Sequence, residues 1–261
     1  MMQEKYLLME NVDVRLGSRK ILENINFSVQ KGEFWSILGP NGSGKTTFLR
    51  ALGGWLPYEK GQVLLQGQEL KNMARKTVAR KIAMVAVQES NNSFTVKETV
   101  FMGRFSHLGR FGSRQQEDEE AVALAMNEVG VYDKKDRLMN KLSQGERQKV
   151  WVARALAQDA DILLMDEPTA HLDVKNQSEV FSLLEKLCSS QKLAVIAILH
   201  DINLALSFSS NLLFLQSGRI RTMGPKADVI DIDELEQLYQ IPFELERDNN
   251  GACWVKILYK K

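Results

Sequence analysis

The chain has 261 residues, of which 26% are charged, and a formal net charge of +1 at pH 7. This balance leaves no overall basic surface of the kind that nucleic-acid-binding domains present. No apolar run in the sequence approaches the roughly 20 residues that cross a bilayer. If the protein acts at a membrane, we therefore expect it to do so through a partner.

Cysteine usage and length narrow the class of protein further. Cys188 and Cys253 stand far apart in apolar surroundings, which is typical of core thiols in a reduced, cytosolic protein. The first residues lack the apolar core of a signal peptide. The length suits one large α/β domain with an appended subdomain.

The first 38 residues predict short β-strands. Apolar and polar residues alternate over 7–14, 21–29 and 34–38, and the segments 16–19 and 31–32 between these runs have the composition of turns. We therefore expect antiparallel strands that lead into the loop that follows. Another strand is predicted at 61–65, where Gly67 closes it.

A glycine-rich loop follows the third run and precedes a helical pattern. Glycines allow tight turns that point backbone N–H groups at an anion, and the helix presents the positive end of its dipole to the same charge. Lys45 is placed to reach the β- and γ-phosphates of a nucleotide, and the Thr46 hydroxyl to ligate Mg²⁺. A glycine-rich turn without a ligand is the alternative. The candidate phosphate-binding residues are Gly39, Pro40, Asn41, Gly42, Ser43, Gly44, Lys45, Thr46 and Thr47.

The middle of the chain predicts a helical insertion. A basic helical stretch at 75–80 precedes a buried strand at 82–87, which ends at Gln88. Within the weakly periodic stretch that follows, 103–110 has the composition of a surface loop or a short helix pair rather than of core. An amphipathic helix with an acidic start is predicted at 114–129. Its expected buried face holds Ala121, Leu124, Ala125 and Val129.

A second group of polar residues follows the insertion. In the sequence 142–146, Ser143 and Gly145 stand at the start of a predicted helix. A buried strand at 162–165 leads to Asp166 and Glu167, and another at 193–199 leads to His200. In an open α/β sheet, ligands bind at the carboxyl ends of the strands, so these side chains should gather beside Lys45.

The last part of the chain carries no recognisable chemistry. We predict a strand from Asn211 with a turn at 217–218, a helix over 227–239, and a hairpin formed by 243–246 and 253–259. We interpret this segment as an accessory element.

With these residues in this order, the chain resembles the ATP-binding cassette family along nearly its whole length. The matching motifs are the phosphate loop at 39–46, the glutamine loop at Gln88, the signature at 142–146, the acidic strand end at 162–167, the D-loop at 170–173 and the switch histidine His200. The resemblance implies an α/β fold with a P-loop NTPase (RecA-like) core, an antiparallel β subdomain and a helical insertion subdomain. One ATPase domain would fill 1–261, with the β subdomain and core in 5–88 and 158–225, the insertion in 89–157 and the accessory element in 226–261.

The resemblance also implies a homodimer that holds two ATP molecules between its subunits. Lys45 would neutralise the phosphates, and Thr46, Gln88 and Asp166 would hold Mg²⁺. Glu167 would act as general base, with His200 orienting the water or the γ-phosphate. Ser143 and Gly145 would come from the other subunit, and Asp173 would border the nucleotide. Taken one by one, these residues have plainer interpretations: carboxylates capping the turn at Pro168, a satisfied core histidine and a helix cap at Ser143.

Two positions depart from the family pattern. Leu16, flanked by Arg15 and Arg19, stands where the family places an aromatic ring against adenine. Gln144 and Glu146 replace the usual glycine and glutamine of the signature, and backbone contacts can survive both changes.

Among the subfamilies, the chain looks like the ATPase subunits of bacterial importers for iron-siderophore complexes, haem and cobalamin. The residues that support this are 102–108, 200–205 and 224–225. Two transmembrane permease subunits, and indirectly a substrate-binding protein, would be the partners at the cytoplasmic face of the membrane, with no nucleic acid. Permease contacts are expected in 89–110, with Phe105 as an anchor. The alternatives are a soluble cassette ATPase acting on nucleic acid or the ribosome, and a nucleotide-binding scaffold without hydrolysis.

Overall fold

A computed structural model describes residues 5–86, 93–108, 115–168, 172–190, 193–248 and 253–258. Gln88 lies outside the described residues, as do residues 170 and 171 of the D-loop. None of the described helices is long and apolar enough to cross a membrane.

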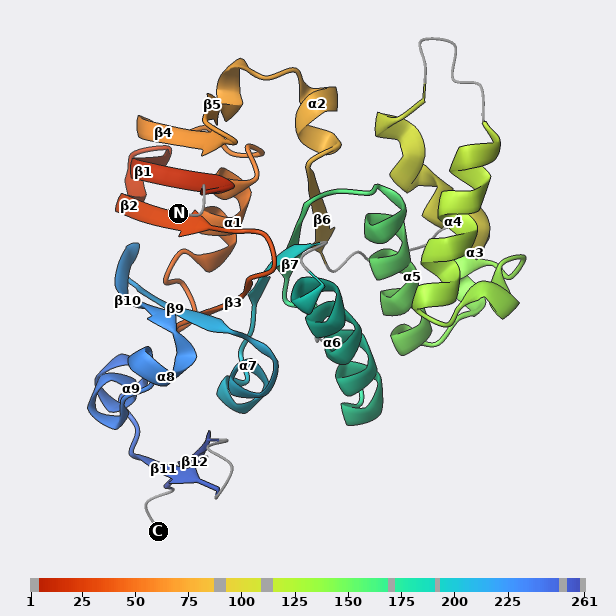
Figure 1. Cartoon of the computed structure of the whole chain (residues 1–261). Helices are drawn as coiled ribbons and strands as arrows, with labels where there is room; N and C mark the ends of the chain where they lie inside the picture. Colours follow the sequence, from red (N-terminus) through yellow and green to blue (C-terminus); the bar gives the residue numbers. More distant parts are fainter. Residues whose placement is uncertain are drawn as a thin grey trace.

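The centre of the molecule is a six-stranded sheet (Figure 1). Every residue of its two middle strands is buried, as expected for parallel strands covered on both faces. All neighbouring strands pair in parallel except the edge strand β10, which pairs antiparallel with β9. In order across the sheet, the strands are β10 (Arg219–Pro225), β9 (Asn211–Gln216), β3 (Phe34–Leu38), β8 (Ala194–Ile198), β7 (Ile162–Asp166) and β6 (Ile82–Ala86).

A second, antiparallel sheet lies beside the first. Its order is β2 (Arg19–Val29), β1 (Leu7–Leu16), β4 (Lys60–Leu65) and β5 (Gln68–Glu69). The first two predicted runs thus pair antiparallel, whereas the third, β3, belongs to the parallel sheet. Helix α1 (Lys45–Leu52) packs between the two sheets, and Phe27 meets Trp35 and Phe48 edge to face with ring centroids 5.0 and 5.3 Å apart. This shared core fixes the start of α1 against both sheets.

The helical insertion forms a separate group, on the right in Figure 1. Its helices α3 (Val96–Phe101), α4 (Gln116–Glu128) and α5 (Gln144–Ala157) pack against one another, and α2 (Arg75–Ala79) borders them on the core side. Short 3₁₀ helices span Leu70–Asn72, Met102–Ser106, Tyr132–Lys134 and Met139–Lys141.

The predicted buried face of α4 is wrong at Leu124, whose exposure is 62%. Val122 and Met126 are buried with Ala125 and Val129 instead. These four residues form two i, i+4 pairs, so the buried stripe is rotated from the predicted one toward α5.

The segment at 103–110 was predicted to lie at the surface, and its beginning is instead part of the core. A side chain on Gly103 would meet the Arg154 carbonyl oxygen at 2.2 Å. Arg104 is buried and pairs with Asp118 of α4, with Nε 2.9 Å from Oδ1, and a second guanidinium nitrogen donates to the Ala157 carbonyl at 2.9 Å. Arg104 therefore ties the 3₁₀ helix to both α4 and α5.

Helices α6 (Val174–Ser189) and α7 (Ile202–Phe208) complete the core, and Cys188 is buried in α6. The accessory segment contains α8 (Lys226–Val229), α9 (Ile232–Tyr239), β11 (Phe243–Arg247) and β12 (Cys253–Ile257). The helix predicted over 227–239 is divided because Asp231 caps α9 by accepting from the Glu234 N–H. The hairpin of β11 and β12 forms as predicted.

Candidate active site

The loop between β3 and α1 has a backbone that only glycine allows at key points. Gly39 has a φ of 145°, and a side chain there would meet the Leu215 carbonyl oxygen at 2.1 Å. Gly44 caps α1 with a φ of 104° and offers no side-chain partner to the first N–H groups of the helix. Those N–H groups and the positive end of the helix dipole are therefore directed at the space in front of the loop.

Two buried polar side chains belong to this loop. Lys45 is 7% exposed, and its Nζ donates to the carbonyl oxygens of Gly39 at 2.8 Å and Pro40 at 3.1 Å. Burial lowers the pKa of Lys45. The Ser43 hydroxyl is buried and has no hydrogen-bond partner among the described residues. An anion at the loop would supply what both groups need.

The carboxyl end of β7 lies beside the loop. Thr46 Oγ1, in the first turn of α1, donates to Asp166 Oδ1 at 3.2 Å. Burial raises the pKa of Asp166, and the charge of Glu167 adds to that rise, although the Thr46 hydrogen bond opposes it. A hydroxyl and a carboxylate thus meet at the start of α1, and both are oxygen ligands of the kind Mg²⁺ prefers.

Glu167 and His200 meet at the same edge of the sheet. Glu167 has a φ of 51°, which few non-glycine residues adopt, and its Oε1 lies 2.8 Å from His200 Nε2. The two side chains are 43% and 51% exposed. A satisfied core histidine is therefore the wrong interpretation of His200. Among the described residues, the side-chain contacts of Asp166 and Glu167 go to Thr46 and His200 rather than to the turn at Pro168.

A cavity of about 490 Å³ opens in front of the phosphate loop. The turn between β9 and β10 links this loop to β2, since the Gly218 N–H donates to the Ser43 carbonyl and its own carbonyl accepts from the Glu23 N–H, both at 2.9 Å. The lining residues are Arg19, Lys20 and Ile21 of β2, residues 41–47, Glu167, Ser217 and Gly218.

A family model described as ABC transporter matches residues 22–170, which hold the phosphate loop and both carboxylates. The chain belongs to the ABC transporter family. It is 35% identical over 255 residues to the iron(3+)-hydroxamate import ATP-binding protein FhuC of Bacillus subtilis (strain 168), a match that covers 96% of this chain and 95% of that protein.

Solved structures of ABC proteins share the fold. A metal-chelate type ABC transporter in an inward-facing conformation matches with a TM-score of 0.85 and 26% identity over 98% of each chain. The dimeric structure of MJ0796, a bacterial ABC transporter cassette, matches with a TM-score of 0.73 and 28% identity over 84% of this chain and 98% of that one. The predicted fold class is confirmed, and the chain is an ATP-binding ABC ATPase.

The ABC signature residues do not line this cavity. Ser143 caps α5 by accepting from the Glu146 N–H at 3.3 Å, while Glu146 Oε2 accepts from the Ser143 N–H at 2.8 Å. The unusual glutamate of the signature thus completes a capping box. Gly145 faces Asn176, since a side chain there would meet the Asn176 amide at 2.7 Å. The same amide side chain donates to Asp173, which caps α6.

The structure differs from the sequence-based expectation at the outer wall of the cavity. Leu16 is 48% exposed and is not a lining residue, so the wall begins three residues later at Arg19. The turn at Ser217 and Gly218 was predicted only as a turn. Its place in the site depends on pairing between β9 and β3, a long-range contact that local composition does not reveal.

Proposed function

We propose that this chain is the energy-coupling ATPase of an importer for a metal chelate of the iron-siderophore class. The observation that carries the proposal is that Lys45, Thr46 and Glu167 line one cavity beside the phosphate loop. Asp166 contacts Thr46, and His200 contacts Glu167, so both lie directly behind lining residues. The similarity to an iron(3+)-hydroxamate import protein and to a metal-chelate type transporter supports the cargo class within the predicted set of iron-siderophore, haem and cobalamin.

In this proposal the phosphate loop holds ATP through its N–H groups and Lys45. Thr46 and Asp166, with Gln88, would hold Mg²⁺, which neutralises charge on the phosphates when bound. Glu167 accepts a proton from the attacking water, and His200 Nε2 holds that carboxylate in place. Positioning and charge placement are sufficient contributions, because phosphoryl transfer needs little covalent chemistry from the protein.

A second copy of the chain would complete the site. Ser143, Gly145 and Asp173 stand at the starts of α5 and α6 and are absent from the cavity lining. The similarity to a dimeric cassette supports the proposal that they face the nucleotide of the partner subunit. Association around ATP would then join the two halves of each site.

The membrane subunit would dock in a groove between the core and the insertion. The groove has a volume of about 770 Å³ and is lined by Trp55, Met73, Val78 and Arg154, among others. Trp55 is 48% exposed, and Phe105 is 60% exposed on the adjoining 3₁₀ helix. Arg80 Nε donates to the Ser106 carbonyl at 2.8 Å, which keeps that helix beside α2. The two exposed aromatic rings are candidate anchors for a permease helix.

The test is to isolate the protein from its native membrane in mild detergent and to identify what co-purifies. ATPase activity is measured with iron chelates, haem and cobalamin. We expect a membrane subunit with many spans and turnover that responds to one iron chelate. Trp55→Ala and Phe105→Ala should each lose that subunit, whereas Leu124→Ala, an exposed apolar residue outside the groove, should keep it. Recovery with nucleic acid or ribosomes instead, with no effect of any cargo, would contradict the importer.

A further inference from the structure

The outer wall of the cavity carries no ring for a purine base. Among the described residues that line the cavity, none is aromatic. Across from the phosphate loop, the wall consists of Arg19, Lys20 and Ile21 at the start of β2. Ile21 packs against the loop, with its Cγ2 3.6 Å from the point where a side chain of Gly44 would begin. Apolar contact is therefore available only at the inner end of this wall.

We propose that Arg19 is the base-stacking residue of this ATPase, with its guanidinium plane packed on the adenine ring. The proposal rests on the assignment of this cavity as the nucleotide site. A guanidinium is planar and weakly hydrated, and it stacks on aromatic faces through cation–π attraction. A lysine ammonium has no such plane, so arginine and lysine at this position should differ in base stacking although both carry a positive charge.

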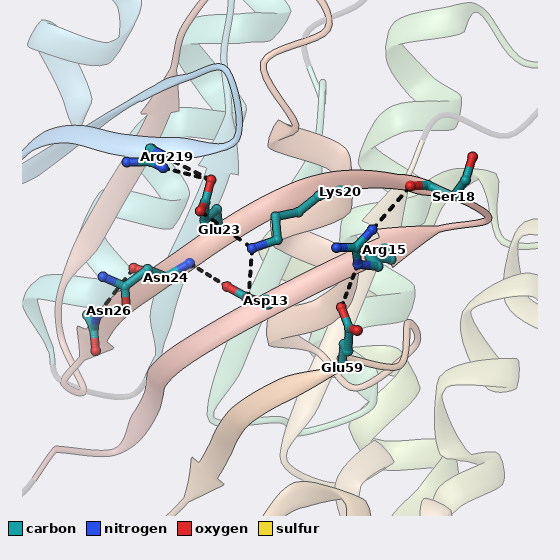
Figure 2. A network of polar contacts seen from close by, with 9 residues as sticks. All are labelled: Asp13, Arg15, Ser18, Lys20, Glu23, Asn24, Asn26, Glu59 and Arg219. Carbon is teal, nitrogen blue, oxygen red and sulfur yellow. Dashed lines mark hydrogen bonds and ion pairs between the residues drawn. The ribbon is translucent and has the colours of Figure 1, made fainter.

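The neighbouring cations are already paired with carboxylates (Figure 2). Lys20 Nζ lies 3.1 Å from Asp13 and 3.4 Å from Glu23, and Arg219 lies 2.8 Å from the other oxygen of Glu23. Arg15 pairs with Glu59 at 2.7 Å. Arg19 is exposed, and no hydrogen bond or ion pair joins its side chain to another described residue. Its head group is therefore the one cation of this wall that is available to a ligand within the described part of the chain.

The same network holds the wall in position. Asp13 is only 6% exposed and accepts from the Asn24 N–H at 2.7 Å as well as from Lys20. Glu23 links β2 to β10 through Arg219, and its N–H binds the Gly218 carbonyl in the turn beside the phosphate loop. Arg19 thus projects from a strand that is fixed relative to the phosphate-binding groups, which lowers the entropy lost when a base stacks on it.

The experiment is a direct titration of the purified full-length protein with ATP and with inorganic tripolyphosphate, at one Mg²⁺ concentration. Tripolyphosphate has the phosphates of ATP but no base. Arg19→Ala and Arg19→Lys should each weaken ATP binding about 2- to 5-fold, the scale of an exposed cation–π contact, and leave tripolyphosphate binding unchanged. Arg19→Tyr, which places an aromatic ring at this position, should keep the affinity for ATP. Arg15→Ala is the matched control and should change neither ligand, since Arg15 does not line the cavity.

Two results would overturn the proposal. Full ATP affinity in Arg19→Lys would mean that only the positive charge matters. Equal losses for ATP and tripolyphosphate in Arg19→Ala would place Arg19 on a phosphate rather than on the base. Failure of the nucleotide site itself has a different signature, because the wild-type protein would then bind neither ligand and Lys45→Ala would change nothing.

Discussion

Two close side-chain pairs in this molecule, each with one carboxylate, have opposite surroundings. Glu167 and His200 meet at the edge of the central sheet with 43% and 51% of their side chains exposed. Arg104 and Asp118 meet inside the helical insertion with 11% and 7% exposed. The separations are nearly equal, 2.8 and 2.9 Å, so distance alone does not tell the two pairs apart.

The difference in burial decides what each pair contributes. An exposed pair is worth about 0–1 kcal/mol, because water solvates the separated partners nearly as well. Breaking a buried pair leaves an uncompensated charge and costs about 3–5 kcal/mol. We therefore expect the exposed pair to matter for turnover and the buried pair for folding.

The largest expected effect is on turnover in Glu167→Gln. Loss of a general base slows the chemical step by about 100- to 10,000-fold, while the phosphate loop that binds ATP is left intact. Single-turnover assays measure the rate, and size-exclusion chromatography with ATP should show accumulated dimer. A urea titration should give a free energy of unfolding within about 1 kcal/mol of the wild type. Undiminished hydrolysis, or only monomer with ATP, would contradict the assignment of Glu167.

The next effect is on stability in Arg104→Met. Removing the guanidinium leaves Asp118 buried without its partner, so the free energy of unfolding should fall by about 3–5 kcal/mol. Burial alone would raise the pKa of Asp118, but the hydrogen bonds from Arg104 and from the Gln115 N–H hold that pKa below its usual range. Because the folded pKa is depressed, the stabilisation is present above the unfolded pKa and is lost as pH falls through the folded one.

Urea unfolding at pH 7 and at decreasing pH measures both parts of this prediction. The difference between wild type and Arg104→Met should narrow in acid. The double variant Arg104→Met/Asp118→Leu is the control, and it should recover much of the lost stability because neither charge remains. A single variant as stable as the wild type would show that the pair contributes nothing to folding.

The same contrast explains how much the sequence could predict. The residues of the active edge were predictable because the phosphate loop, Asp166, Glu167 and His200 each follow a short apolar run, and parallel strands bring such ends together. Arg104 was wrongly predicted to lie at the surface, because a charged residue beside Gly103 is typical of a surface loop. Its buried partners, Asp118 and the Ala157 carbonyl, belong to α4 and α5, and only the packing of these two helices brings them to Arg104.

The outer wall of the cavity was missed for a related reason. The resemblance to the ABC family places Leu16 at the adenine, whereas strand register and the turn at Ser217 and Gly218 bring Arg19 into the cavity wall. The shift of the buried face of α4 has the same cause. Periodicity predicts an apolar face on the helix, but packing against the neighbouring helix decides which residues lie at the centre of that face. Long-range contacts decide each of these cases.

A neutral, partly buried contact should have an effect between those of the two side-chain pairs. Asn203 of α7 donates to the Val255 carbonyl at 2.9 Å and accepts from the Val255 N–H at 2.7 Å, which attaches the C-terminal hairpin to the core. Asn203→Ala should lose about 1–3 kcal/mol locally, because two backbone groups of β12 lose their partners. Hydrogen exchange should show faster exchange in β12 and little change in β7. Asn176→Ala, which removes a comparable amide at the start of α6, is the control and should leave β12 protected.

The smallest effect expected is a gain in stability at the active site. Burial raises the pKa of Asp166, so its ionised form is disfavoured in the folded protein, and the group destabilises the fold above that raised pKa. Asp166→Asn keeps an acceptor for Thr46 without the charge. It should raise the free energy of unfolding at pH 7 by less than about 1 kcal/mol, since the carboxylate is only partly removed from water. The difference should shrink as pH falls toward the unfolded pKa, where the wild-type carboxyl is protonated as well. Urea titrations of both proteins across this range measure the sign, and a loss of stability at pH 7 would mean that the ionised Asp166 is held by partners that stabilise the folded state.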